Sequence, residues 1–192
     1  MRGLLLILGT ALACGLQAVD VPQRVAELDL EKVAGTWHTV AMAANDPSLL
    51  EPESAPLRVF IKEARPMPEG SLELTLSRQE NNECIEKTIL MEKTQDPAQF
   101  RIDSPDGDKV FVLDADSTSY LFLCVESAAG PTQNLACQAL ARTLQADPEV
   151  MKKFKLVLKA LPLQVRLFLD LTEGRGECTQ APGPPLPGSM GG

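Results

Sequence analysis

The chain has 192 residues, 44% of them hydrophobic, which predicts a single folded domain with an apolar core. Its 26 acidic and 18 basic residues give a formal net charge of -8, which disfavours binding to nucleic-acid phosphates. Aromatic residues make up only 4%, so platforms for base stacking are not expected either. The single histidine, His38, excludes a multi-histidine metal site. We expect no metal, no cofactor and no nucleic-acid partner.

The N-terminus is typical of a secretory signal peptide. Arg2 precedes an apolar run over residues 3–15, and Leu16-Gln17-Ala18 offers a cleavage site that ends in a small residue. The alternative, a membrane anchor, is disfavoured because the run is shorter than the roughly 20 residues that span a bilayer. We expect residues 1–18 to be removed, leaving a secreted, extracellular protein without stable membrane insertion.

The middle of the chain alternates apolar and polar residues with the period of two that is typical of β-strands. Turn-prone segments separate the predicted strands, which cover residues 57–62, 72–77, 85–91, 100–103, 110–113 and 120–125. Short strands at this spacing favour an antiparallel barrel or sandwich. An immunoglobulin-type sandwich is the weaker alternative, because Trp37 precedes every cysteine of the mature chain.

Two cations continue the apolar faces of neighbouring predicted strands. Arg78 has the parity of Leu72, Leu74 and Leu76, and Lys87 has the parity of the apolar positions on the next strand. With a turn over residues 79–83, both cations lie on the apolar face near one end of a hairpin. They suit the anionic head of an amphiphile if that face lines a cavity. The alternative is that both are solvated cations beside a turn.

One helix is predicted late in the chain. Asp147 serves as the N-cap, Pro148 suits the first helical position, and apolar residues recur at helical spacing up to Leu161. The lysines on the other face allow two interpretations, a helix that packs on the sheet or one that lies on a membrane, and the first is favoured. Pro162 ends the helix, a last strand follows over residues 165–171, and the Pro- and Gly-rich residues 179–192 are predicted to be disordered.

Four cysteines remain once Cys14 leaves with the signal peptide: Cys84, Cys124, Cys137 and Cys178. An even number in a secreted chain implies two disulfides, for which three pairings exist. No Cys-x-x-Cys pair occurs, which disfavours a metal or redox role.

Four segments stand out: the Gly35-Thr36-Trp37 motif within DLEKVAGTWHTVAMAA at 29–44, SAPLRV at 54–59, Glu-Lys-Thr at 92–94 and Leu-Ala-Cys-Gln at 135–138. Together they resemble the lipocalin family, in its β-lactoglobulin and glycodelin group. The resemblance covers residues 19–178. It implies an all-β fold with one flanking α-helix, an eight-stranded up-and-down antiparallel barrel, and a ninth strand.

The resemblance also implies roles for particular residues. It pairs Cys84 with Cys178 and Cys124 with Cys137. It makes Gly35, Trp37 and Arg142 structural, with Arg142 packed across the indole. The implied ligand-binding residues are the basic Arg78 and Lys87 at the mouth and the apolar positions of the calyx, namely Pro56, Leu57, Val59, Leu72, Leu74, Leu76, Ile89, Met91, Ile102, Val110, Val112, Leu123 and Val125.

The chain departs from the family pattern at two loops. Gly107 stands where a gate-loop glutamate is found in related proteins, so a pH switch does not carry over. Ala115-Asp116-Ser117 replaces a Thr-Asp-Tyr motif, which predicts a looser turn.

The leading hypothesis is a secreted carrier of small hydrophobic molecules such as retinoids or fatty acids. The alternatives are a reproductive-tract or immunomodulatory lipocalin that acts on other proteins, and an abundant nutritive milk whey protein. A homodimer or a cell-surface receptor are the further candidate partners. No catalytic motif occurs, and His38 adjoins the closed end of the barrel, so enzyme activity is not expected.

Overall fold

The computed structural model describes residues 25, 27–104, 107–127, 133–173 and 177–178. The predictions for the signal peptide and for residues 179–192 therefore lie outside the described residues. Within the described part, no helix is both long enough and apolar enough to cross a bilayer.

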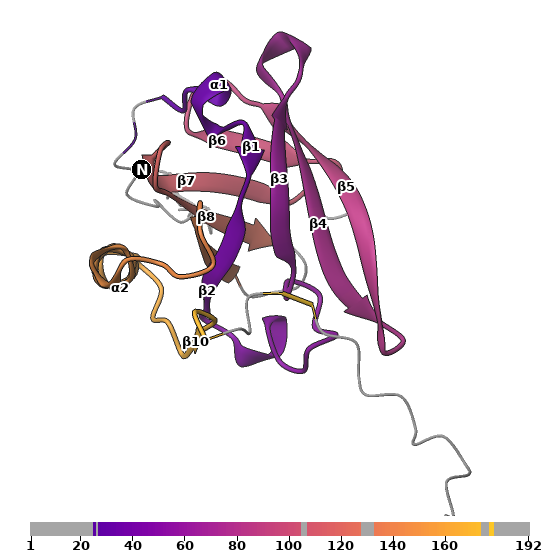
Figure 1. Ribbon diagram of the computed structural model, residues 1–192, viewed down its shortest axis with the longest axis vertical. Coiled ribbons are helices and arrows are strands. Elements are labelled where there is room, and N and C mark those ends of the chain that lie inside the picture. The colour runs from indigo at the N-terminus through magenta and orange to yellow at the C-terminus, as the bar shows by residue number, and fades with distance from the viewer. Residues whose placement is uncertain (1–24, 26, 105–106, 128–132, 174–176, 179–192) are drawn as a thin grey trace, which may run out of the picture.

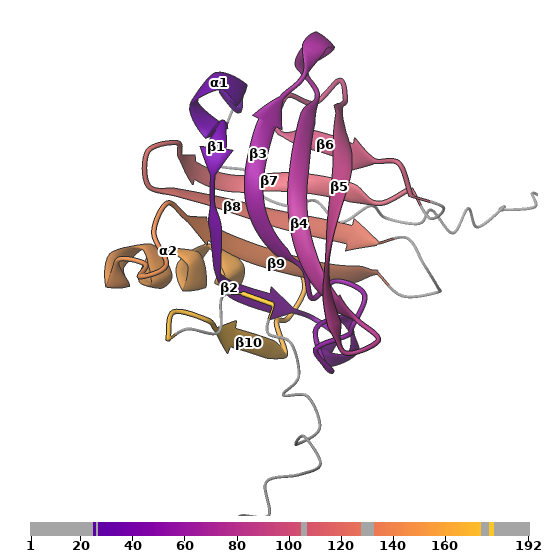
Figure 2. The same ribbon diagram turned by 45° about the vertical axis from the view of Figure 1, so that its right-hand side comes forward.

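Ten strands form one antiparallel sheet that curls around a central axis (Figures 1 and 2). The neighbour order is β1-β3-β4-β5-β6-β7-β8-β9-β2-β10, so most strands pair with their successors in the chain. The strands are β1 (Gly35–Thr36), β2 (His38–Ala44), β3 (Phe60–Pro66), β4 (Leu72–Glu80), β5 (Glu83–Lys93), β6 (Gln99–Ile102), β7 (Lys109–Asp116), β8 (Tyr120–Ser127), β9 (Asn134–Ala141) and β10 (Leu167–Asp170).

The barrel closes where β1 runs into β2. β1 pairs with β3 at one end of the sheet, and β2 pairs with β9 at the other. Two hydrogen bonds join the seam: Trp37 N donates to Lys62 O at 2.9 Å, and Ile61 N donates to Thr39 Oγ1 at 2.9 Å. The prediction of an eight-stranded barrel, β2–β9, with a ninth strand, β10, beside it is confirmed.

The hairpin between β4 and β5 is longer than its sequence predicts. The strands pair as far as Glu80 and Glu83, so the turn is Asn81-Asn82 rather than residues 79–83. Both asparagines have positive φ, 52° and 67°, which matches the twist of a two-residue hairpin turn. The predicted strand at 57–62 is also shifted, because β3 begins only at Phe60.

Two short 3₁₀ turns, Pro47–Leu49 and Pro68–Gly70, and the single-turn helix α1 (Leu30–Val33) lie in the connections. The longest helix in the described part of the chain, α2 (Pro148–Lys159), begins as predicted, because the Asp147 side chain accepts a hydrogen bond from Glu149 N at 2.9 Å.

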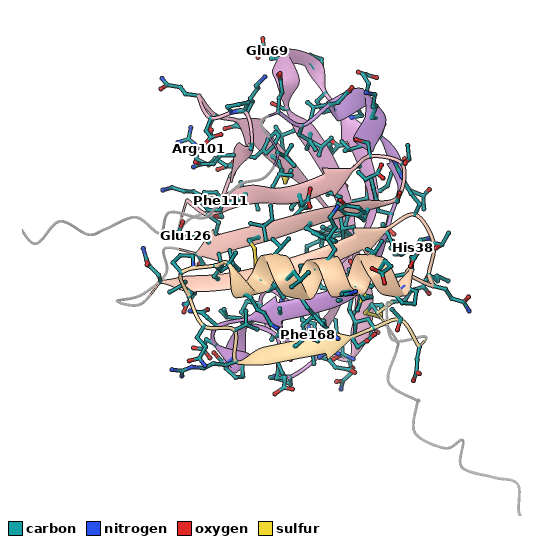
Figure 3. All side chains as sticks on the ribbon, turned by 90° about the vertical axis from the view of Figure 1, so that its left-hand side faces the viewer. His38, Glu69, Arg101, Phe111, Glu126 and Phe168 are labelled. Atoms are coloured by element: carbon teal, nitrogen blue, oxygen red, sulfur yellow. A yellow bond between two sulfur atoms is a disulfide. The ribbon has the colours of Figure 1, made fainter. Side chains whose placement is uncertain are left out.

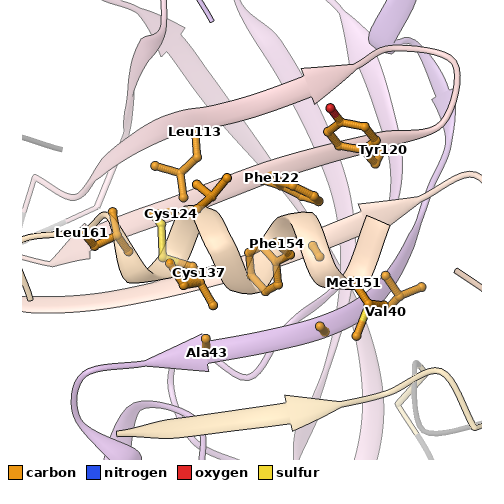
Figure 4. Packing of buried hydrophobic residues seen from close by; sticks show 14 of the residues in the cluster. Val40, Ala43, Leu113, Tyr120, Phe122, Cys124, Cys137, Met151, Phe154 and Leu161 are labelled. Atoms are coloured by element: carbon orange, nitrogen blue, oxygen red, sulfur yellow. A yellow bond between two sulfur atoms is a disulfide. The ribbon is translucent and has the colours of Figure 1, made fainter. Parts of the chain in front are cut away.

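Helix α2 lies across the outside of the barrel (Figure 3). Its buried side chains are Met151, Phe154, Val157 and Leu158, and they pack against the outward face of β8 and β9 (Figure 4). Each buried side chain of this size contributes about 1.5–3 kcal/mol. The helix therefore packs on the sheet, and the interpretation as a membrane-surface helix finds no support in these contacts.

Both disulfides have the pairing that the family resemblance implies. Cys124 and Cys137 are register partners on β8 and β9, with their Cα atoms 4.0 Å apart, beneath α2. Cys84 on β5 is bonded to Cys178, 94 residues further along the chain. This second bridge ties the C-terminal end of the domain to the outside of the barrel.

Candidate ligand-binding cavity

A cavity of about 190 Å³ lies inside the barrel. It exists because alternate residues of the curled strands point inward, and most of those residues are apolar. The lining residues are Pro56, Leu57, Val59, Ile61, Leu74, Leu76, Arg78, Lys87, Ile89, Met91, Ile102, Asp108, Val110, Leu123, Val125 and Gln138.

Every residue predicted to bind ligand lines this cavity except Leu72 and Val112. Both of these are fully buried, at 0% exposure, in the cluster that also holds Trp37 and Phe100. Bulky side chains thus fill the closed end of the barrel, so the cavity stops above the layer of Leu72 and Val112. These two predicted positions therefore lie beneath the cavity and outside its lining.

The lining also contains residues that the sequence reasoning missed. Ile61 has the same parity as Val59, so the alternation of apolar and polar residues could have predicted it. Gln138 comes from β9, a strand whose small and apolar residues show no clear alternation. Its Nε2 donates to Val59 O at 3.0 Å, while its Oε1 accepts from Thr39 Oγ1 at 3.3 Å, so both ends of this buried amide are satisfied.

The mouth of the cavity is polar and is formed by Arg78, Lys87 and Glu80. The sequence analysis predicted the two cations at this end but not Glu80. The side chains of Arg78 and Lys87 are 25% and 47% exposed, so this end of the cavity reaches solvent. Glu80 Oε1 lies 2.5 Å from Lys87 Nζ and 3.3 Å from Arg78 Nε. The hydrogen bond from Lys87, supported by the charge of Arg78, lowers the pKa of Glu80. The two cations are therefore already paired with a carboxylate of the protein.

Trp37 closes the other end. Its indole Nε1 donates to Val33 O at 2.8 Å, and the Arg142 guanidinium lies over the ring with Cζ 3.7 Å from the centroid. Arg142 also donates to the carbonyl oxygens of Lys32, Thr36 and Ser117. Arg142 thus connects Trp37 with three backbone carbonyl groups at this end of the barrel.

Gly35 belongs to the same corner of the barrel. It has φ of 100°, a backbone conformation that residues with a Cβ rarely adopt. A Cβ at this position would lie 3.5 Å from Arg142 Nη1. Glycine therefore allows both the backbone turn and the approach of the arginine.

The turn between β7 and β8 is firmly bonded, contrary to the prediction of a looser turn. The Asp116 carboxylate accepts hydrogen bonds from Thr118 N at 3.1 Å, from Thr118 Oγ1 at 2.7 Å and from Ser119 Oγ at 3.0 Å. Those bonds lower the pKa of Asp116, the bond from the Thr118 hydroxyl most of all. The Asp116 side chain thus holds this turn, and Arg142 supports it by donating to Ser117 O.

A closed barrel with an apolar interior, a polar mouth and one flanking helix defines a binding protein of the calyx type. The chain matches the lipocalin / cytosolic fatty-acid binding protein family over residues 34–173. It therefore belongs to the lipocalin family.

Three relatives extend this comparison. The chain is 50% identical to β-lactoglobulin-2 of Felis catus over 159 residues, which are 82% of this chain and 98% of the relative. It is 52% identical to β-lactoglobulin-1 of Equus asinus, over 83% of this chain and 98% of the relative. It is 46% identical to β-lactoglobulin-2 of Equus caballus, over 93% and 99% respectively. The chain is thus a non-enzymatic lipocalin similar to the β-lactoglobulins. Its membership of this family is evidence for the binding of small hydrophobic ligands.

Proposed function

We propose that this protein is a secreted carrier that holds small hydrophobic molecules, of the retinoid and fatty-acid kind, in its central cavity. The observation that carries the proposal is the apolar cavity with its polar mouth. Each methylene that leaves water for such a cavity contributes about 0.8 kcal/mol, so an acyl or isoprenoid chain binds without any catalytic group.

The size of the cavity sets a limit on the guest. The cavity of about 190 Å³ is smaller than the roughly 300–1,000 Å³ that is typical of ligand pockets. A guest that fills a pocket of that size requires the lining side chains to move. Met91, which lines the cavity and has an unbranched side chain, is suited to such movement.

Neighbouring residues on β5 provide a matched test of the site. Ile89 lines the cavity, whereas Leu90 points outward and is 39% exposed. Ile89→Trp fills the cavity and should weaken retinol binding at least about tenfold, which is about 1.4 kcal/mol. Leu90→Trp adds the same bulk outside and should leave the affinity unchanged.

Native mass spectrometry gives the stoichiometry, expected to be one ligand per chain, and retinol fluorescence gives the affinity. Unchanged thermal midpoints for both variants would show that the barrel is intact. Equal affinity of the Ile89→Trp variant and the natural protein would contradict binding in the cavity.

Secretion is the second part of the proposal. It is supported by the N-terminal residues 1–18, which have the features of a signal peptide, and by two disulfides, which persist in oxidising compartments. Expression of the full chain in mammalian cells should release a protein whose N-terminal residue is Val19. Retention of the protein inside the cells, or an uncleaved N-terminus, would contradict this part.

The similarity to β-lactoglobulins also supports a role as a milk whey protein. This role and the carrier role are compatible, because the first depends on abundance and the second on the cavity. Measurement of the protein in whey tests the first, and the ligand titrations test the second.

A further inference from the structure

Helix α2 carries a positive surface on a protein whose net charge is negative. The helix contains four lysines and one acidic residue, Glu149, whereas the whole chain has a formal net charge of -8. No acidic residue lies between Glu149 and Asp170 in the sequence. None of the four lysines lines the cavity inside the barrel. This positive charge therefore lies outside the proposed carrier site.

Three of the four lysines gather on one side of the helix. Lys152, Lys155 and Lys159 are spaced three and four residues apart, which places them in one row, and we call these three residues the lysine row. All three line the same groove, together with Leu156. At a rise of 1.5 Å per residue, the row is about 10 Å long. The row is exposed to solvent, because α2 lies on the outside of the barrel (Figure 3).

The lysine row has few ion-pair partners of its own. Lys152 Nζ lies 3.7 Å from Glu149 Oε2, and the two side chains are 69% and 79% exposed, so this pair is weak. Lys155 Nζ lies over the Phe168 ring, 4.9 Å from its centroid, a contact that leaves the positive charge in place. Within the described part of the chain, neither Lys155 nor Lys159 has a carboxylate oxygen within ion-pair distance.

Two carboxylates near the helix do not neutralise the row. Asp114 lies 3.6 Å from the fourth lysine, Lys153, which also donates a hydrogen bond to Tyr120 Oη. Asp170 lines the groove, and its Oδ1 accepts hydrogen bonds from the backbone and the hydroxyl of Thr172. Three lysines and one carboxylate leave the described lining of the groove with a net charge of +2.

The partner of this surface must be anionic and need not be apolar. The apolar side chains Met151, Phe154, Val157 and Leu158 are buried against the barrel, so they cannot enter a lipid bilayer. Among the residues of α2, Leu156 is the large apolar side chain that stays exposed, at 52%. A row of fixed positive charges suits a linear polyanion, because each ionic contact releases counterions and the contributions of several contacts combine.

We propose that the lysine row binds a sulfated polysaccharide, a linear polyanion of cell surfaces and the extracellular matrix. Clusters of lysines on this scale are typical of heparin-binding patches. Charges are screened beyond about 8 Å at physiological salt, so a chain that lies along the row interacts with the lysines rather than with distant acidic residues. The site is outside the barrel, so it can hold the protein at a sulfated surface without occupying the cavity.

The test measures binding of the full mature protein to heparin by surface plasmon resonance. Three ionic contacts give a slope of about -2 to -3 for log affinity against log salt, so the affinity should fall about tenfold to twentyfold between about 50 and about 150 mM sodium chloride. Hyaluronan carries carboxylates but no sulfates. Because its charge density is lower, it should bind at least about tenfold more weakly than heparin does.

A matched pair of double variants assigns the binding to the row. Lys155→Gln/Lys159→Gln removes two charges from the row and should weaken heparin binding about tenfold. Lys62→Gln/Lys93→Gln removes two charges from half-exposed lysines on β3 and β5, outside the contact between α2 and the barrel. The change in net charge is the same, so this control should keep the affinity within about twofold.

Substitutions of Leu156 test the same surface without altering a lysine. Leu156→Asp places a carboxylate beside the row and should weaken heparin binding about fivefold, because it repels the sulfates. Leu156→Asn has nearly the same shape without the charge and should keep the affinity within about twofold. Because this side chain is exposed, both variants should keep the thermal midpoint of the natural protein.

Three outcomes would overturn the proposal. The first is an absence of heparin binding at about 50 mM salt, and the second is an equal loss of affinity in the two double variants. The third is binding to phosphatidylserine vesicles that is tighter than binding to heparin and is lost in Leu156→Asn, which would assign this surface to a membrane. Retinol binding in the cavity is measured separately, so none of these outcomes affects the carrier function.

Discussion

Removal of the Arg142 side chain tests how the closed end of the barrel is held. The guanidinium lies over Trp37 and donates to Lys32 O at 2.9 Å, Thr36 O at 2.9 Å and Ser117 O at 3.1 Å. These carbonyl groups belong to three separate segments, namely α1, β1 and the turn that joins β7 to β8. One side chain thus fastens three parts of the chain to the end of β9.

The expected loss follows from these contacts. A hydrogen bond from a charged donor contributes about 1.5–3 kcal/mol, and a cation–π contact contributes about 0.5–2 kcal/mol. Two of the three hydrogen bonds are accessible to solvent and the contributions are not additive, so the loss falls below the roughly 5 kcal/mol that the lower limits would give together. We therefore expect Arg142→Ala to lower the free energy of unfolding by about 3 kcal/mol, out of the roughly 5–15 kcal/mol that is typical of a domain.

Two further variants distinguish the proposed contacts from a simple effect of charge. Arg142→Lys keeps the charge but loses the planar fork and the stacking, so about half of the loss should remain. Arg101→Ala removes an exposed arginine from β6 and should change the stability by less than about 0.5 kcal/mol.

Urea unfolding followed by the emission of Trp37 provides the measurement, because this is the only tryptophan in the chain. The slope of the free energy against urea concentration should be the same for all variants, so that midpoints can be compared. A loss below about 1 kcal/mol for Arg142→Ala, or full stability of Arg142→Lys, would refute the reasoning.

Three other perturbations have expected outcomes that the same unfolding assay can check. Phe154→Ala empties the centre of the contact between α2 and the barrel and should cost about 3–5 kcal/mol; a loss below about 1 kcal/mol would contradict close packing there. The double variant Cys124→Ala/Cys137→Ala opens a loop with a separation of 13 residues and should cost about 3 kcal/mol by loop entropy, and an unchanged urea midpoint would count against it. The pKa of Asp116 is lowered in the folded state, chiefly by the Thr118 hydroxyl, so its stabilising contribution is complete above the unfolded-state pKa and is lost as the pH falls through the folded-state value. Asp116→Asn should therefore destabilise the protein at pH 7 but less so near pH 2, and an equal effect at both pH values would exclude this linkage.

The sequence predicts the strands of the barrel where one face is buried and the other is wet. β4 and β5 illustrate this: Leu72, Leu74 and Leu76 are buried, while Glu73 and Thr75 between them are only half-buried. β9 could not be found in this way, because α2 covers its outer face and the barrel interior covers its inner face. All of its residues from Leu135 to Ala141 are buried, and the alternation disappears.

The apolar lining of the cavity was predictable for the same reason, since parity alone brings Leu74, Leu76 and Ile89 to one face. The depth of the cavity was not predictable from parity. Whether an inward residue lines a void or fills it depends on neighbours from distant strands. Leu72 and Val112 have the right parity, yet Trp37 and Phe100 pack with them in one buried cluster and leave no space. Only the three-dimensional packing decides this point.

The mouth illustrates how strongly a binding site depends on where its strands end. Parity is meaningful only while a residue belongs to a strand, and treating residues 79–83 as turn removed Glu80 from the inward face. Asn81 and Asn82 tolerate positive φ, which allows the turn to shrink to two residues and the pairing to continue to Glu80. That one extra inward position converts a pair of free cations into an ion-paired cluster. The charged residues that stand at the mouth of such a barrel are therefore determined by how far its turns let the strand pairing run.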